Sequence, residues 1–392
     1  MRQFDVVVIG AGAAGMMAAA VAGQRGRSVL IVDHADAPGQ KIRISGGGRC
    51  NFTNVNAAPS AFLSQNPRFA ISALKRYRPS DFIALVQRYG IAFHEKTLGQ
   101  LFCDGSARQI IEMLVSEMTQ AGVVLETAVQ VDEIRREDDR FALRLTNGAV
   151  RCQSLIIASG GKSIPKMGAS GFAYRVADQF GIAVTETRPA LVPLTFEAGM
   201  LEKFKPLAGI SFDAIASAGK TSFREGMLFT HRGVSGPSIL QISSYWREGQ
   251  AIGIDLAPDV TLNDWLSEAR ARNGGQSVAV ALGSIMPRRL ADMIVDDIGV
   301  AGNLADLGKT QMQRLITAVK DWRVKPVGTE GYRTAEVTLG GIDTAALQSS
   351  DMQSRTIRGL YFIGEAVDVT GWLGGYNFQW AWASGWSAGQ TA

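Results

Sequence analysis

The sequence predicts an α/β fold built on a central parallel β-sheet, and two segments lead to this prediction. Residues 6–23 carry no charge and divide into a β-branched run, a glycine-rich turn and an alanine-rich run, which is typical of a buried strand followed by a buried helix. Residues 360–385 repeat this order, with a short apolar strand, several glycines and an apolar helix. With 392 residues, of which 46% are hydrophobic, the chain is long enough for two or three folded units.

Composition and charge argue against several classes of protein. Lys and Arg total 40 against 36 Asp and Glu, and this small excess is dispersed, so a nucleic-acid partner is not expected. The uncharged residues 6–23 include four glycines and follow Asp5, which argues against a membrane span and a secretory leader. Cys50, Cys103 and Cys152 are the three cysteines, and so few are typical of a reducing compartment. We therefore expect a cytoplasmic protein.

The first glycine turn has the pattern of a dinucleotide site. We expect a strand at residues 4–9, the turn at 10–15, a helix at 16–25 and a second strand at 28–32, ending at Asp33. This is G-x-G-x-x-G inside a βαβ unit, with an acid 23 positions after the first glycine. Asp33 would accept hydrogen bonds from a ribose 2′-hydroxyl, which argues against NADP at this site. The turn residues expected to approach a pyrophosphate are Gly10, Gly12, Ala13, Ala14 and Gly15.

A second glycine-rich segment, residues 40–51, follows the second strand. Its three consecutive glycines would let a flat ring system lie against the backbone, with polar side chains around the electron-rich edge of the ring. A mobile surface loop is the alternative interpretation. The candidate cofactor-binding residues of this segment are Lys41, Ser45, Gly46, Gly47, Arg49, Cys50 and Asn51.

The C-terminal segment is the third candidate for contact with a cofactor. Residues 376–385 are expected to form a buried helix whose amino end has free N–H groups and about half a positive charge. Facing a flavin, this end would favour the anionic reduced ring, so this segment and residues 40–51 favour FAD over NAD. Core packing is the alternative role, and it explains Trp380, Trp382 and Trp386 better. The candidate residues here are Gly364, Glu365, Asp368, Gly374, Gly375, Tyr376, Asn377 and Gln379.

Four segments together resemble the HI0933-like flavoprotein family of the glutathione-reductase-like superfamily. They are the turn at Gly10, residues 45–51 with Asn54, residues 228–237 and residues 359–385. The resemblance implies an FAD-dependent oxidoreductase with a Rossmann-like FAD-binding domain, interrupted by a β-rich domain and a helical subdomain. The expected boundaries are 1–190 with 327–392 for the FAD-binding domain, 191–256 for the β-rich domain and 257–326 for the helical subdomain.

Two more segments are expected near the cofactor. Residues 155–161 have the pattern of a strand that runs into a glycine turn, which would bring Ser159, Gly160 and Gly161 back to the site. Val131 stands where relatives in the resembled family contact adenine. Trp372 replaces a smaller or acidic residue of those relatives, so their substrates are not carried over to this chain.

The direction of hydride transfer stays open in the sequence. Residues 189–334 contain no second dinucleotide fingerprint, so hydride would come from a small-molecule substrate, or from NADH or NADPH docked directly at the flavin. Arg49, His231 and Tyr376 are the candidate catalytic residues, as proton or anion partners, although His231 is more typical of a structural histidine. The alternatives to a small-molecule oxidoreductase are an amine oxidase similar to aminoacetone oxidase that uses oxygen, and a flavin-binding protein linked to RNA. Spacings of His and Cys predict no metal site.

Two serines are expected to cap helices and not to act as nucleophiles. Ser106 and Gln109 have the spacing of a capping box. Ser235 precedes Pro237, which suits the first turn of a helix, and the segment lacks the second glycine of a hydrolase nucleophile elbow.

Overall fold

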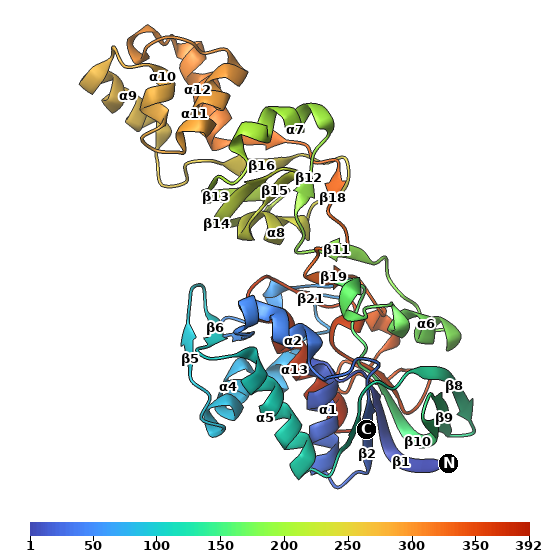
Figure 1. Ribbon diagram of the computed structural model, residues 1–392. Coiled ribbons are helices and arrows are strands. Elements are labelled where there is room, and N and C mark those ends of the chain that lie inside the picture. The colour runs from blue at the N-terminus through green and yellow to red at the C-terminus, as the bar shows by residue number, and fades with distance from the viewer. The chain divides into compact units, whose positions relative to one another are not determined.

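The computed structural model describes residues 1–392, which divide into two compact units (Figure 1). Unit 1 consists of Met1–Arg188 and Val337–Ala392, and unit 2 consists of Pro189–Glu336. The chain passes between the units at β11 (Arg188–Ala190) and β19 (Val337–Leu339). No helix in either unit combines the length and the apolar character needed to cross a bilayer.

The main sheet of unit 1 has seven strands in the order β7-β2-β1-β10-β9-β8, and β20 pairs with β10 as well. Strands β7, β2, β1, β10 and β20 are parallel, whereas β9 runs antiparallel to the first half of β10 and to β8. This confirms the predicted α/β fold. The strands are β1 (Arg2–Ile9), β2 (Val29–Val32), β7 (Val124–Glu126), β8 (Val131–Glu137), β9 (Arg140–Leu145), β10 (Gly148–Ile157) and β20 (Leu360–Phe362).

The parallel strands place the candidate segments at one edge of the sheet. Strand β1 leads into the first glycine turn, β2 into Asp33, β10 into Ser159 and β20 into Gly364. The carboxyl ends of parallel strands meet at the same edge, where open α/β sheets bind their ligands. Segments that are far apart in the sequence therefore converge there without any local sequence signal.

Two helices pack against each other beside this sheet (Figure 1). Helix α1 (Ala13–Gln24) begins one turn earlier than predicted, directly after the glycine turn, and α13 (Tyr376–Gly389) lies against it. A Cβ at Gly385 would lie 2.4 Å from the Ala14 carbonyl oxygen, and one at Gly389 would lie 2.7 Å from the Ala18 carbonyl oxygen. The two backbones touch because α13 has glycine at these positions.

The rest of unit 1 is built on short helices and strands between β2 and β7 and beyond β10. The capping box at the start of α5 is confirmed, since Ser106 Oγ accepts from Arg108 N and Gln109 Oε1 accepts from Ser106 N, both at 3.2 Å. The elements are α2 (Gln40–Ile44), β3 (Asn51–Asn54), β4 (Phe62–Leu63), α3 (Ile71–Arg76), α4 (Pro79–Arg88), β5 (Phe93–Glu95), β6 (Gln100–Cys103), α5 (Ala107–Gln120), α6 (Phe172–Gln179) and β21 (Thr370–Gly371).

Unit 2 contains a seven-stranded antiparallel sheet in the order β17-β16-β13-β14-β15-β12-β18. Four helices, α9–α12, are inserted between β16 and β17. The strands are β12 (Leu194–Thr195), β13 (Ser211–Ala218), β14 (Thr221–Thr230), β15 (Gly233–Ser235), β16 (Ile252–Asp255), β17 (Trp322–Val324) and β18 (Gly328–Thr329). The helices are α7 (Ala198–Phe204), α8 (Pro237–Ser243), α9 (Leu262–Asn273), α10 (Val278–Leu282), α11 (Arg288–Ile298) and α12 (Lys309–Lys320).

The predicted cap at Ser235 is wrong by one residue. Ser235 ends β15, and Gly236 is the N-cap of α8, with Pro237 as the first helical residue. The cap position has a φ of 91°, and a Cβ there would lie 2.6 Å from the Gly226 carbonyl oxygen. Glycine is required because both the dihedral angle and the neighbouring strand exclude a side chain.

Candidate functional site

The glycines of the first turn have different surroundings: two of them pack against protein atoms and one faces open space. A Cβ at Gly10, whose φ is 108°, would lie 2.5 Å from the Ala158 carbonyl oxygen, and one at Gly15 would lie 1.9 Å from the Gly10 carbonyl oxygen. A Cβ at Gly12 would have no atom within 4 Å. Gly10 and Gly15 therefore shape the turn, while the backbone at Gly12 is open to a ligand.

The amino end of α1 offers hydrogen-bond donors beside this open backbone. The first hydrogen bond of the helix runs from Met16 N to Gly12 O at 3.0 Å. The N–H groups of Ala13, Ala14 and Gly15 therefore have no acceptor within the helix. Together with the helix dipole, they form a site suited to a pyrophosphate.

Asp33 follows β2, and its carboxylate accepts hydrogen bonds from two backbone N–H groups, one of them in the glycine turn. Its Oδ2 accepts from Ala11 N at 2.6 Å and its Oδ1 accepts from Ala35 N at 2.9 Å, while His34 Nδ1 lies 3.3 Å from Oδ1. Each carboxylate oxygen keeps a second lone pair, so the ribose role predicted for Asp33 is compatible with these bonds.

The segment before β8 reaches the same strand end, and the sequence did not single it out. Val129 N donates to the Asp33 carbonyl oxygen and Ala128 N donates to the Ala35 carbonyl oxygen, both at 2.9 Å. Val131 lies two residues further on, at the start of β8, and pairs with Leu145 of β9. The adenine contact predicted at Val131 stays a prediction, and residues 128–129 are the nearer part of the segment to Asp33.

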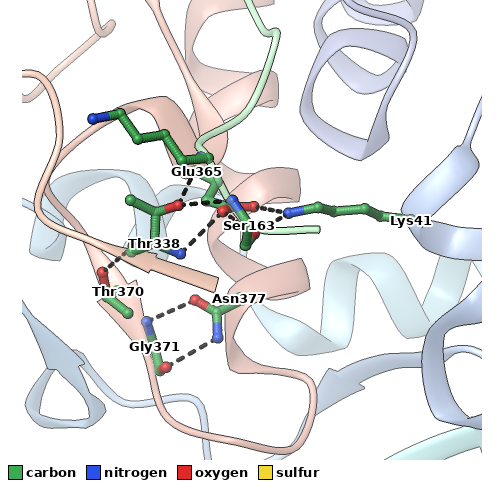
Figure 2. Close-up of polar contacts among 8 residues, drawn as sticks. Lys41, Ser163, Thr338, Glu365, Thr370, Gly371 and Asn377 are labelled. Carbon is green, nitrogen blue, oxygen red and sulfur yellow. Dashed lines mark hydrogen bonds and ion pairs between the residues drawn. The ribbon is translucent and has the colours of Figure 1, made fainter. Parts of the chain in front are cut away.

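A network of polar side chains joins α2, the turn after β10 and the end of β20 (Figure 2). Lys41 Nζ donates to Glu365 Oε2 at 2.6 Å and to Ser163 Oγ at 2.5 Å. Ser163 Oγ in turn donates to Glu365 Oε1 at 2.6 Å, and Thr338 N donates to the same oxygen at 3.0 Å. The Thr338 hydroxyl oxygen accepts from Lys162 N at 2.8 Å and from Ser163 N at 3.2 Å. Lys41 and Glu365 were predicted site residues, whereas Ser163 and Thr338 were not.

The turn after β10 contains an unusual hydroxyl group. Ser159 Oγ is buried and has no hydrogen-bond partner in the protein, although buried hydroxyl groups are normally paired. A Cβ at the neighbouring Gly160 would meet nothing within 4 Å, whereas one at Gly161 would lie 2.4 Å from Thr338 Oγ1. The turn thus presents an unpaired polar atom and an open backbone at the sheet edge.

The glycine-rich segment forms a tight turn beside β3 and β6. Gly46, Gly47 and Gly48 have φ angles of 57°, 66° and 85°, which residues other than glycine rarely adopt. A Cβ at Gly47 would meet nothing within 4 Å, and Arg49 is exposed beside it. The backbone at Gly47 is therefore open, and contact of this segment with a flat ring stays a prediction. Ser45 Oγ donates to the Ile42 carbonyl oxygen at 2.8 Å.

Cys50 near the end of this segment and Cys103 in β6 have no solvent exposure. Burial raises the pKa of the Cys50 thiol far above its ordinary range, and it raises the pKa of Cys103 to about 11. Both thiols are therefore protonated at neutral pH, which argues against a thiolate at this site.

The loop before α13 is fixed by amide side chains. Asn377 Oδ1 accepts from Gly371 N at 2.8 Å, and its Nδ2 donates to the Gly371 carbonyl oxygen at 2.9 Å (Figure 2). Asn54 Nδ2 donates to the Gly374 carbonyl oxygen at 2.9 Å. A Cβ at Gly375, whose φ is 93°, would lie 2.4 Å from the Thr53 carbonyl oxygen. This places the start of α13 directly against β3, next to the glycine-rich segment.

Two other predicted residues have side chains bonded within the protein, and a third belongs to unit 2. Gln379 is fully buried, accepts from Thr53 Oγ1 at 2.7 Å and donates to the Tyr77 carbonyl oxygen at 2.9 Å. Asp368 accepts from Gln65 N at 2.9 Å, and burial raises the pKa of its carboxyl group. His231 lies in unit 2, exposed in the turn between β14 and β15.

These features fit FAD. Helices α1 and α13 both begin at this edge with N–H groups that have no acceptor within the helix, and open backbone is available at Gly12, Gly47 and Gly160. The buried Ser159 hydroxyl has no hydrogen-bond partner within the protein. A dinucleotide with a flat ring at one end would use all of these groups. No three His, Cys, Asp or Glu side chains come together as metal ligands would.

Comparison with known proteins agrees with this geometry. The family model described as HI0933-like protein Rossmann domain matches residues 4–391. A ribosomal RNA dihydrouridine synthase of Escherichia coli (strain K12) is 51% identical to the chain, over 100% of this chain and 98% of that protein. An enzyme of the same name from Haemophilus influenzae is 45% identical, over 98% of this chain and 97% of that protein. A 3-dehydro-bile acid delta(4,6)-reductase of Clostridium scindens is 29% identical over 98% of both proteins.

Among solved structures, the open conformation of a flavocytochrome c3 fumarate reductase is similar to the chain. It has a TM-score of 0.49 and 17% identity, and the match covers 99% of this chain and 78% of that one. The match to the family model extends over nearly the whole sequence. The chain therefore belongs to the HI0933-like family, and it is an FAD-dependent oxidoreductase.

Proposed function

We propose that this chain is a ribosomal RNA dihydrouridine synthase, which reduces the C5–C6 double bond of a uridine in rRNA. The observation that carries the proposal is the 51% identity to the Escherichia coli enzyme of that name over 100% of this chain. Each uridine takes up one hydride equivalent and one proton. NADH or NADPH would supply the hydride equivalent and leave as NAD⁺ or NADP⁺. The substrate is then a nucleotide within an RNA. The sequence alone instead predicts a small molecule and no nucleic-acid partner, because its basic residues are dispersed along the chain.

The chain's own residues would bind the cofactor, orient the uracil ring and handle the proton. When bound, FAD supplies the carrier of the hydride equivalent. The C5–C6 bond of uracil is conjugated to the C4 carbonyl, so negative charge develops towards O4 as hydride adds at C6. Donors fixed in place before the reaction would stabilise that charge. The first N–H groups of α13 and the exposed guanidinium of Arg49 are donors of this kind near the glycine-rich segment.

Tyr376 is the candidate for delivering the proton to C5. It is the first residue of α13, it is 7% exposed, and its ring lies edge-on to Phe62 with centroids 6.1 Å apart. A phenol holds a proton at neutral pH, and the aromatic contacts fix the position of Oη. His231 in unit 2 stays a second candidate.

The test uses the purified chain with FAD, NADPH or NADH, and rRNA transcribed without modifications. We expect nucleoside mass spectrometry to show one or more uridines that have gained two hydrogens, and oxidation of the nicotinamide to depend on the RNA. Tyr376→Phe should lower the rate of dihydrouridine formation while FAD reduction by the nicotinamide continues. Wild-type protein that carries FAD yet leaves every uridine of the rRNA intact would refute the proposal. Release of peroxide on aminoacetone, without nicotinamide, would instead favour the amine oxidase alternative.

A further inference from the structure

Unit 1 contains a pocket of about 370 Å³ that is not part of the site at the glycine turn. It lies between α1, α4, α5 and the last turns of α13, and its walls include Tyr77, Trp386, Arg88, Glu117 and Gln24. Its volume is at the small end of the range for ligand sites.

The pocket and the flavin-binding edge are at opposite ends of the same helix. The part of α1 that lines the pocket runs from Met17 to Gln24, whereas the open backbone at Gly12 precedes the helix. Twelve helical residues span about 18 Å. Likewise, Trp386 lies ten positions after Tyr376 on α13. A ligand in the pocket therefore occupies a place separate from the reacting ring.

The walls combine aromatic rings with satisfied polar groups. Tyr77 and Trp386 are stacked, with centroids 5.9 Å apart and an interplanar angle of 29°. Glu117 is 8% exposed and accepts from Arg88 Nη2 at 2.8 Å, from Tyr89 Oη at 2.5 Å and from Gln24 Nε2 at 2.9 Å. Its charge is therefore compensated within the pocket. Aromatic rings and guanidinium planes are the surfaces on which proteins stack unpaired nucleobases, and Arg88 keeps 63% of its side chain exposed although it pairs with Glu117.

Three basic residues, Lys75, Arg76 and Arg78, adjoin the pocket wall at Tyr77 and form its basic rim. The wall itself includes Asp81 and Glu117, and Arg78 Nε lies 3.6 Å from Asp81 Oδ2. Arg76 places its guanidinium 5.7 Å from the Trp386 ring centroid and donates to Ser387 Oγ at 3.1 Å. Lys75 and Arg78 are exposed on either side of the Arg76–Tyr77 pair. Such a rim fits the phosphates of a nucleic-acid strand.

We propose that this pocket and its basic rim form a second contact site for the RNA substrate, which takes one unpaired nucleotide while its neighbours run along Lys75, Arg76 and Arg78. The inference rests on the proposed function, because it assumes that the substrate is RNA. A contact remote from the flavin would help to position the target uridine and would not take part in reducing it.

The test measures the affinity of the FAD-loaded protein for a short fluorescein-labelled single-stranded RNA by anisotropy, at several salt concentrations. Two variants probe the site. K75Q/R76Q removes two charges from the rim, and Ala84→Trp fills the pocket from an exposed position that lines it. The matched controls are R135Q/R140Q, which removes two exposed charges from the β8–β9 hairpin, and Thr119→Trp on the outer side of α5.

We expect K75Q/R76Q to weaken RNA binding about tenfold and to reduce the slope of log K against log salt by about 1.4, since each phosphate contact on a single strand contributes about 0.7. Ala84→Trp should weaken binding with little change in slope, and both controls should bind as the wild type does. The FAD content of each preparation reports that unit 1 is folded.

Two results would overturn the inference in distinguishable ways. If both site variants bind RNA like the wild type while the wild type forms dihydrouridine, the RNA site lies elsewhere and the proposed function stands. If the wild type neither binds RNA nor forms dihydrouridine, the inference falls together with the proposed function. Binding to phosphatidylserine vesicles that depends on Lys75 and Arg76, without RNA binding, would assign the rim to a membrane surface and also overturn it.

Discussion

Lys41 and Glu365 are the charged members of the network that joins α2 to the end of β20. They are 324 positions apart in the sequence, and their side chains keep 33% and 18% of their exposure. Partial exposure limits the free energy that such a pair contributes, because solvent screens the charges. The pair nevertheless joins two segments that would contact FAD, so its loss should lower the affinity for FAD.

Lys41→Met is expected to weaken FAD binding about tenfold, or ~1.4 kcal/mol, because Glu365 is left with only Ser163 and Thr338 as partners. Titration of the apoprotein with FAD, followed by quenching of flavin fluorescence, measures the affinity. Lys96→Met is the matched control, since Lys96 is exposed outside the network. A double-mutant cycle with Glu365→Gln should show coupling, and additive effects would contradict the role given to the pair.

Asp368 makes a prediction about pH. Burial raises the pKa of its carboxyl group above the ordinary 3.8. Between 3.8 and that raised pKa the folded protein holds a proton that the unfolded chain has released, so this group makes stability rise as the pH falls through the window. Above the raised pKa the buried carboxylate is charged, and this lowers the free energy of unfolding. Asp368→Asn keeps an oxygen for Gln65 N and should raise the melting temperature of the apoprotein at pH 7. The gain should fade as the pH approaches 3.8. A gain that persists unchanged at low pH would show that charge burial is not its cause.

At the scale of elements, the structure distinguishes glycines that allow close packing from glycines that face open space. Gly12 has ordinary backbone angles and open space where a Cβ would stand, whereas Gly385 on α13 touches the backbone of α1. We expect Gly12→Ala to change the stability of the apoprotein by less than about 1 kcal/mol and yet to weaken FAD binding strongly. Gly385→Ala should cost about 1–3 kcal/mol of stability through overpacking. Urea unfolding of both apoproteins, with FAD titration, distinguishes the two. Equal effects on stability would contradict the assignment.

The sequence predicted those elements whose signal is local. The first strand, turn and helix, the capping box at Ser106 and the C-terminal helix all follow from periodicity and from glycine or serine at fixed offsets. The cap of α8 was missed by one residue because the close approach of Gly226 is a tertiary constraint. Ser163 and Thr338 were missed for the same reason. Their partners lie 27 to 202 positions away in the sequence, and no short pattern encodes such contacts.

At the scale of the molecule, unit 2 is an insertion into unit 1. The chain leaves and returns at neighbouring points of unit 1, since Val184 and Ile342 form an antiparallel bridge and Thr185 N donates to the Gly341 carbonyl oxygen at 2.8 Å. Every residue proposed here to hold FAD belongs to unit 1, and each unit has its own sheet. Of the residues proposed for catalysis, only His231 lies in unit 2.

Unit 1 should therefore fold and bind FAD without unit 2. We expect a chain in which residues 189–336 are replaced by a short Gly-Ser linker to be yellow as purified, to unfold in one cooperative transition and to bind FAD within about tenfold of the full-length affinity, because closing so short a loop costs little entropy. Visible absorbance, circular dichroism and FAD titration measure these properties. Restoring unit 2 with His231→Ala then shows whether that histidine contributes to dihydrouridine formation. A folded but colourless deletion protein that cannot be reconstituted would mean that unit 2 supplies part of the FAD site.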